Sequence, residues 1–192
     1  MDGILSGFGL AGAAGLNAYI PLFILGLASR LGYADLQAPY DLLGSNVGLG
    51  VLAVLLLVEI LADKVPGVDH VNDVINTVVR PAAGGVLALS SVGAGTLHPG
   101  FAALLGIITA GGIHATKATV RPLVTATTGG LGNPVVSTIE DGLSFGVTIM
   151  ALLAPIIVAI LLVLGLIAAV LLIRRLRASR ADRALARSQL AP

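Results

Sequence analysis

The sequence contains no cysteine and few charged residues. None of its 192 residues is Cys, and only 11% are Asp, Glu, Lys or Arg. Without cysteine, disulfides, thiolate metal sites and thiol nucleophiles are excluded. Soluble domains carry about 25% charged residues. This charge-poor chain, with 56% apolar residues, is therefore predicted to be an integral membrane protein.

Catalytic and nucleotide-binding motifs are missing as well. The chain has no Walker loop, no GxSxG and no HExxH, so nothing in it indicates an enzyme. We expect no cofactor other than a bound divalent cation, and no nucleic-acid partner. The expected partners are the lipid bilayer and a small ion or small-molecule substrate, and a homo-oligomer is left open.

What the sequence does contain is a series of apolar runs, several of them near the ~20 residues that a helix needs to cross a bilayer. They predict an all-α polytopic membrane protein with about six transmembrane or half-membrane helices. The segments are Gly3–Ser29, Asn46–Ala62, Val68–Gly93, Phe101–Arg121, Leu123–Gly132 and Leu143–Ile173. Glycines, Asn17 and Pro21 interrupt the first segment, so we expect a broken or a tightly packed helix there. The fifth segment is either a half-helix or a re-entrant loop.

The chain divides into a single membrane domain, residues 1–173, and a basic tail, residues 174–192. Six arginines crowd this tail: Arg174, Arg175, Arg177, Arg180, Arg183 and Arg187. The positive-inside rule therefore places the C-terminus in the cytoplasm, with the chain in the cell (inner) membrane as a multi-pass protein.

A weak internal similarity indicates two halves, 1–97 and 98–173. Residues 13–21 (AAGLNAYIP) resemble residues 110–118 (AGGIHATKA), and both stretches contain a glycine break. An odd number of spans before His98 would invert the second half, an arrangement common in transporters. The same count places the N-terminus in the cytoplasm.

Charged residues concentrate between Glu59 and Pro81, in the stretch EILADKVPGVDHVNDVINTVVRP. Glu59 and Asp63 are four residues apart, as are Asp69 and Asp73, so each pair shares one helix face. Charge at bilayer depth costs about 2.5 to 3.5 kcal/mol per residue. Such a face must therefore meet protein, water or a bound ion.

Two charge sets define the candidate site. The acidic and amide ligands for transport or ion binding are Glu59, Asp63, Asp69, Asp73, Asn76 and Glu140, and the basic partners are Lys64, Arg80, His114, Lys117 and Arg121. Hard divalent cations bind oxygen clusters of this kind, so a metal site at the four residues Glu59, Asp63, Asp69 and Asp73 is predicted. Asn17, at the glycine break, is expected to face the substrate or to satisfy free backbone groups.

Three functions are compatible with these residues. The first is a transporter or channel for a small ion, in which a divalent cation is coupled to protons through the buried carboxylates. The second is a non-catalytic membrane scaffold or assembly protein, whose acidic and basic helices form internal ion pairs. The third is the handling of lipid or of an anionic substrate through Lys64, Arg80, Lys117 and Arg121.

Several motifs together resemble one known family. GLNAYIPL, EILADKVPGVDHVND, VRPAAGG and GLGNPVVSTIEDG, followed by the long final helix, are similar to small bacterial integral-membrane proteins that share a domain of unknown function. The resemblance covers roughly Gly7 to Ile173 and implies a common fold without an established activity. A fainter similarity links EILADK, Glu59 to Lys64, to the acidic motif of small cation/proton antiporters for manganese and calcium.

Overall fold

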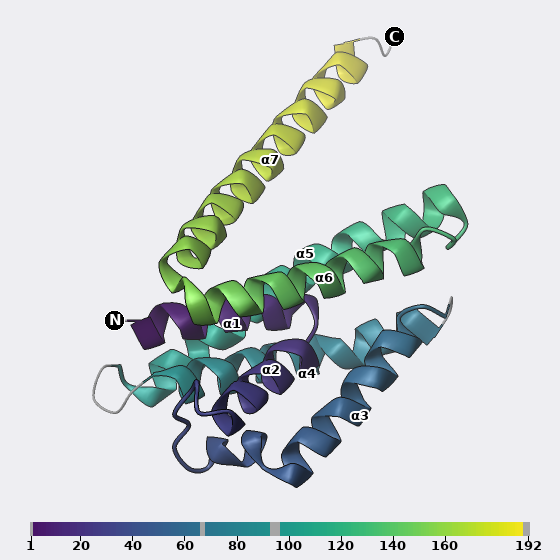
Figure 1. The fold of residues 1–192 in the computed structure, drawn as a ribbon. Coiled ribbons are helices and arrows are strands. Elements are labelled where there is room, and N and C mark those ends of the chain that lie inside the picture. Colours follow the sequence, from purple (N-terminus) through teal and green to yellow (C-terminus); the bar gives the residue numbers. More distant parts are fainter. Residues whose placement is uncertain (1, 66–67, 93–96, 190–192) are drawn as a thin grey trace. The chain divides into compact units, whose positions relative to one another are not determined.

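A computed structural model describes residues 2–65, 68–92 and 97–189. All the regular secondary structure in these ranges is helical. The helices are α1 (Asp2–Leu16), α2 (Tyr19–Arg30), the 3-10 helix η1 (Tyr40–Gly44), α3 (Asn46–Ala62), α4 (Val68–Ser91), α5 (Pro99–Thr128), α6 (Asn133–Leu153) and α7 (Pro155–Gln189) (Figure 1). The chain forms two units, Met1–Val158 and Ala159–Pro192. All of the candidate site lies in the first unit.

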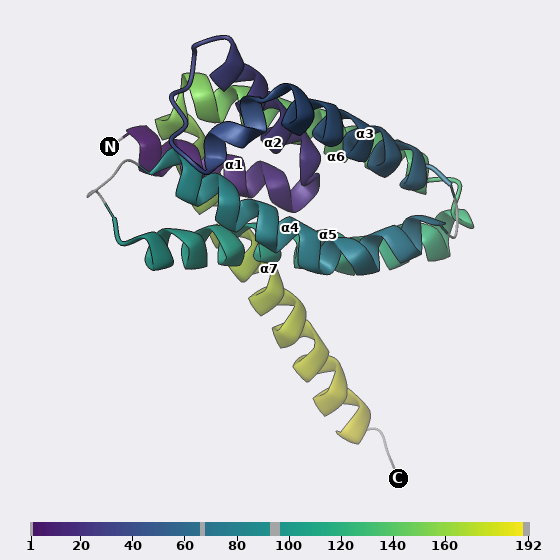
Figure 2. The same ribbon diagram turned by 90° about the horizontal axis from the view of Figure 1, so that it is seen from below.

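The first apolar segment is broken, as the sequence predicts. α1 ends at Leu16 and α2 begins at Tyr19, and α2 runs back toward the end of the unit from which α1 came (Figures 1 and 2). With 15 and 12 residues, at about 1.5 Å per residue, neither helix can cross a hydrocarbon core about 30 Å thick. The two helices therefore form a re-entrant V, whose apex is Leu16–Tyr19.

Helices α3 to α6 alternate in direction. The C-terminal ends of α3 and α5 and the N-terminal ends of α4 and α6 lie together at one end of the unit, which we call the turn end (Figures 1 and 2). α3 begins with a cap, because the side-chain oxygen of Ser45 accepts from the backbone N–H of Gly48. α5 begins in the same way at His98, with Pro99 in its first turn.

Small residues allow α1 and α4 to approach α5 closely. A Cβ atom added to Gly15 in α1 would lie 2.6 Å from the carbonyl oxygen of Ala110 in α5. A Cβ atom added to Gly84 in α4 would lie 2.6 Å from the carbonyl oxygen of Gly106 in α5. Such contacts are typical of helix packing in membranes, where small residues bring backbones together.

Many polar and charged residues are buried while many large apolar residues are exposed, which is unusual for a soluble protein. In α4, Arg80 is 0% exposed whereas Val78 is 73% exposed. Three described helices are long and apolar enough to cross a membrane, and they cover Val71–Ser91, Pro99–Thr128 and Asn133–Leu153. Shorter apolar helices are Gly3–Leu16, Tyr19–Arg30, Asn46–Ala62 and Pro155–Ala168. The chain is thus a polytopic all-α membrane protein.

Two segments differ in detail from the sequence-based expectation. Residues 123–128 continue α5 as regular helix, and the turn is confined to residues 129–132. The long apolar run from Leu143 to Ile173 is split, because α6 ends at Leu153 and α7 begins at Pro155. Proline lacks a backbone N–H and disfavours helical geometry at the residue before it, so Ala154 leaves the helix.

Candidate functional site

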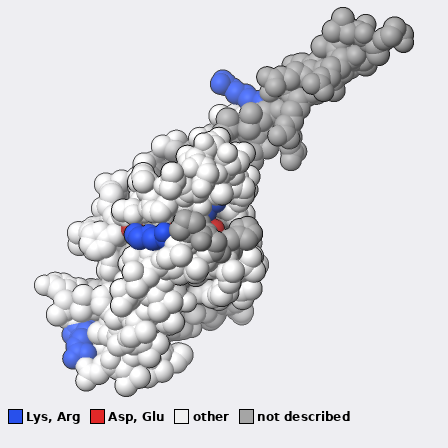
Figure 3. Space-filling model, turned by 90° about the vertical axis from the view of Figure 1, so that its right-hand side faces the viewer, with Lys and Arg blue, Asp and Glu red and all other residues white. Residues whose placement is uncertain are grey.

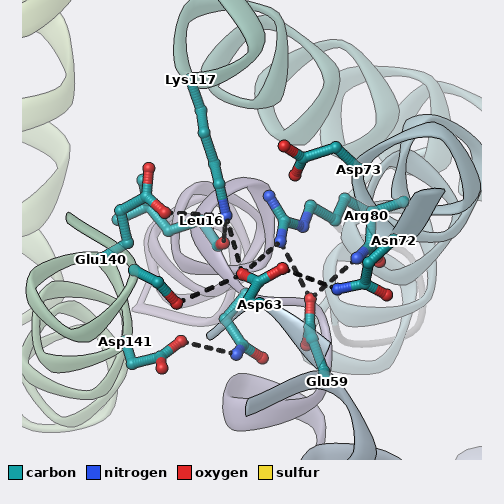
Figure 4. Close-up of polar contacts among 12 residues, drawn as sticks. Leu16, Glu59, Asp63, Asn72, Asp73, Arg80, Lys117, Glu140 and Asp141 are labelled. Carbon is teal, nitrogen blue, oxygen red and sulfur yellow. Dashed lines mark hydrogen bonds and ion pairs between the residues drawn. The ribbon is translucent and has the colours of Figure 1, made fainter. Parts of the chain in front are cut away.

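A buried network of charges lies next to the apex of the V (Figure 4). Four helices and the turn after α3 supply it, and its members are Glu59, Asp63, Asp73, Arg80, Lys117, Arg121 and Glu140. We call this set the buried network. Its side chains range from 0% to 16% exposed.

Asp63 is the centre of the buried network. It directly follows α3 and is 2% exposed. Its Oδ2 atom lies 2.9 Å from Nη2 of Arg121 and 3.5 Å from Nζ of Lys117. Its Oδ1 atom accepts from the amide of Asn72 at 2.7 Å. Because two cations and a neutral donor surround it, Asp63 is held in its ionised form.

Glu59 and Arg80 form the deepest ion pair. Nη2 of Arg80 lies 2.9 Å from Oε1 of Glu59, and the two side chains are 0% and 2% exposed. Asn76 donates to the same oxygen at 3.1 Å. Glu59 stands three residues before the end of α3 and Arg80 stands in the middle of α4, so the pair joins these two helices.

His114 is the second partner of Arg80. Its Nδ1 atom lies 3.2 Å from Nη1 of Arg80, and a guanidinium group can only donate. Nδ1 must therefore be the acceptor, and Nε2 carries the proton, 3.2 Å from the hydroxyl of Thr77. That hydroxyl donates in turn to the carbonyl of Asp73. The bonds assign a neutral histidine protonated at Nε2.

Arg121 and Lys117 tie α4 and α6 to α5. Arg121 lies 3.1 Å from Asp73 in α4 and 3.1 Å from Glu140 in α6. Lys117, one turn earlier on the same face of α5, lies 2.9 Å from Glu140. The basic face predicted for α5 therefore meets acids from both neighbouring helices.

Asn17 and side chains from α5 and α6 hold the apex of the V. Oδ1 of Asn17 accepts from the backbone N–H groups of Tyr19 and Ile20, which caps the start of α2. Lys117 donates to the carbonyl of Leu16 at 3.2 Å, at the negative end of α1. In α6, the hydroxyl of Ser144 donates to the carbonyl of Ala13 at 3.0 Å. The broken backbone is thus satisfied by buried polar groups, as a break inside a membrane requires.

Lys64 and Asp141 form an ion pair at the edge of the site, and we call them the rim pair. Nζ of Lys64 lies 3.6 Å from Oδ2 of Asp141, and the side chains are 35% and 16% exposed. The other oxygen of Asp141 accepts from Nδ2 of Asn17 at 2.9 Å. The rim pair therefore links the apex to the surface.

The charges of the buried network do not balance. Among the described side chains, four carboxylates face three permanent cations, and His114 is neutral. Among the described residues, four buried side-chain atoms have no hydrogen-bond partner: Oε2 of Glu59, Oδ1 of Asp73, Nε of Arg80 and Nε of Arg121. Buried polar atoms without partners are costly, and here they coincide with an excess of one negative charge.

Most residues selected from the sequence come together in this site. Asn17, Glu59, Asp63, Lys64, Asp73, Asn76, Arg80, His114, Lys117, Arg121 and Glu140 all take part in contacts described above. The side chain of Asp69 lies outside the described residues. The sequence led us to expect that at most one of Glu140 and Asp141 would reach the site, because adjacent residues point to different helix faces, yet both make contacts there. Asn72 was considered as a source of a neutral oxygen, and it donates its amide to Asp63. Thr77 and Ser144 were not selected. Among the residues described, no group of three or more His, Cys, Asp or Glu side chains is arranged to hold a metal ion.

Comparison with known proteins supports the family resemblance seen in the sequence. No curated protein and no solved structure matches the chain. A family model, the domain of unknown function DUF4126, matches residues 4–175, which include every residue of the buried network and of the rim pair. The chain therefore belongs to the DUF4126 family.

Proposed function

We propose that this protein is a membrane transporter that couples the movement of a small ion to the protonation of Glu59. The observation that carries the proposal is the buried network at the apex of a broken helix. In many transporters, broken helices place free backbone ends and charged groups at the substrate site. Here Lys117 contacts both the end of α1 and Glu140.

Glu59 is the carboxylate best suited to accept the proton. Its Oε1 atom is bonded to Arg80 and Asn76, while Oε2 is buried and has no partner among the described residues. A proton on Oε2 would leave both existing bonds in place. Asp63, by contrast, uses both oxygens to bind cations and donors. Protonation of Glu59 would also remove the excess negative charge.

A resident divalent cation is a weaker part of this proposal. Asp63 and Glu140 already lie within 3.1 Å of Arg121. A metal ion would have to displace this arginine or repel it at short range. We therefore propose the proton as the ion held at rest, and a metal cation only as transported cargo that enters when the pairs separate.

A membrane scaffold is the second candidate, and one observation favours it. Each cation of the buried network has at least one carboxylate within 3.1 Å. However, buried ion pairs seldom stabilise a protein more than apolar packing would. A scaffold gives no reason to bury four carboxylates at a helix break.

The test is proton flux in vesicles. Purified protein in liposomes that contain a pH-sensitive dye would be exposed to gradients of manganese, calcium, magnesium, sodium or potassium. We expect at least one gradient to drive proton movement, and Glu59→Gln to reduce it at least tenfold while Asp41→Asn, an exposed acid of η1, leaves it unchanged. If no gradient drives protons through the wild-type protein, the scaffold becomes the better explanation. If Glu59→Gln is as active as the wild type, the role of Glu59 in proton coupling must be abandoned.

A further inference from the structure

The rim pair is more exposed than the buried network. The exposed fraction is 2% for Glu59, 16% for Asp141 and 35% for Lys64. Figure 3 views the turn end. There, charged atoms of both signs reach the surface close together.

The rim pair is the most exposed ionic contact of the described site. Its side chains are 35% and 16% exposed, whereas those of Glu59–Arg80 and of Lys117–Glu140 are at most 12% exposed. Water competes for partly exposed pairs, so they stabilise a protein little. The rim pair can therefore open at small cost while the inner pairs stay closed.

Opening the rim pair would act directly on the apex of the V. Asp141 binds Lys64 through Oδ2 and Asn17 through Oδ1, so one carboxylate connects the turn after α3 with the break between α1 and α2. Asn17 in turn caps α2. Movement of Asp141 therefore loosens the contact that holds the apex against α6.

We propose that the rim pair is the gate between the buried network and the aqueous phase at the turn end, and that Asp141 is its moving part. Lys64 holds Asp141 in the closed position, and Asn17 passes the movement to the apex. This inference deepens the proposed function, because a transporter site needs controlled access to water. Its test is independent of transport.

Accessibility of a buried cysteine tests the gate, since the chain has no cysteine of its own. Ser144→Cys places a thiol beside the apex at a position that is 0% exposed. We expect it to react slowly with a small water-soluble methanethiosulfonate reagent. Lys64→Gln, or Asp141→Asn, should raise the rate at least tenfold, whereas Asp41→Asn should leave it unchanged.

A second buried cysteine separates gating from general loosening. Leu87 is also 0% exposed, and it lies near the C-terminal end of α4, away from the turn end. Leu87→Cys therefore reports on a different part of the unit. Its reaction rate should not change in the Lys64→Gln background. Equal acceleration at both positions, or no acceleration at Ser144→Cys, would overturn the gate. Acceleration at Ser144→Cys alone in a protein without proton flux would retain the gate and reject the proposed transport.

Discussion

Arg80 donates to Nδ1 of His114 over 3.2 Å, so a fully buried cation is oriented by the lone pair of a neutral histidine. The other terminal nitrogen of the guanidinium, Nη2, donates to Oε1 of Glu59. Arg80 is therefore held between one charged and one neutral acceptor. The neutral acceptor fixes the direction of the group without adding another charge to the network.

The role of His114 as an acceptor can be tested by two substitutions. His114→Gln keeps one acceptor for Arg80 and one donor for Thr77, so we expect a stability close to that of the wild type. His114→Leu leaves Nη1 of Arg80 without its partner, which should cost about 1 to 3 kcal/mol. Thermal unfolding in detergent measures the difference. Equal loss in both variants would mean that ring packing, and not the acceptor, is what matters.

Asp63 and Glu59 should respond differently to loss of charge. Asp63→Asn removes one of the two carboxylates that Arg121 and Lys117 share, the other being Glu140, and breaking a buried pair costs about 3 to 5 kcal/mol. Glu59→Gln imitates the protonated side chain and keeps an acceptor for Arg80, so its cost should be smaller. Unfolding of the two variants under identical detergent conditions compares them directly. A larger loss for Glu59→Gln would contradict the assignment of Glu59 as the protonated group.

The close contact between α1 and α5 predicts the effect of a methyl group at Gly15. In Gly15→Ala the new Cβ atom would lie 2.6 Å from the carbonyl of Ala110 and 2.7 Å from Cβ of Ile113. The helices would have to separate, and overpacking of this kind costs about 1 to 3 kcal/mol. Gly112→Ala in α5, where an added Cβ meets nothing within 4 Å, is the matched control. Similar stabilities of the two variants would show that the helices adjust freely.

The re-entrant V makes a prediction about topology. Tyr33 follows α2 and Leu131 lies at the turn end, and both are highly exposed, at 85% and 82%. Single cysteines at these two positions should react with an impermeant thiol reagent from opposite sides of the membrane. If the N-terminus is cytoplasmic and the V is re-entrant, Leu131→Cys reacts in intact cells and Tyr33→Cys only after lysis. The reverse pattern would mean that the V crosses the membrane, and reaction of both from one side would mean that α3, α4 and α5 do not make three crossings.

The sequence predicted the positions of the helices more completely than the contacts between them. The range Asn46–Ala62 was correct for α3, and the break at Asn17 was anticipated from its glycines and amide. Whether the chain continues or turns back at Asn17 is decided by Lys117 and by α6, which are more than 90 residues away. The expectation that only one of Glu140 and Asp141 would reach the site was wrong for the same reason. Adjacent positions on a helix face different neighbours, and only packing shows that both faces of α6 are occupied.

The pairing of Glu59 with Arg80 also bears on how the chain enters the membrane during synthesis. α3 emerges first, with a carboxylate whose cation lies 21 residues further along, in α4. A lone α3 would carry an uncompensated charge into lipid, at a cost of about 2.5 to 3.5 kcal/mol on insertion scales. α4 alone would carry Arg80 in the same way. Insertion of the two segments together as a helical hairpin would pair the two charges and avoid both costs.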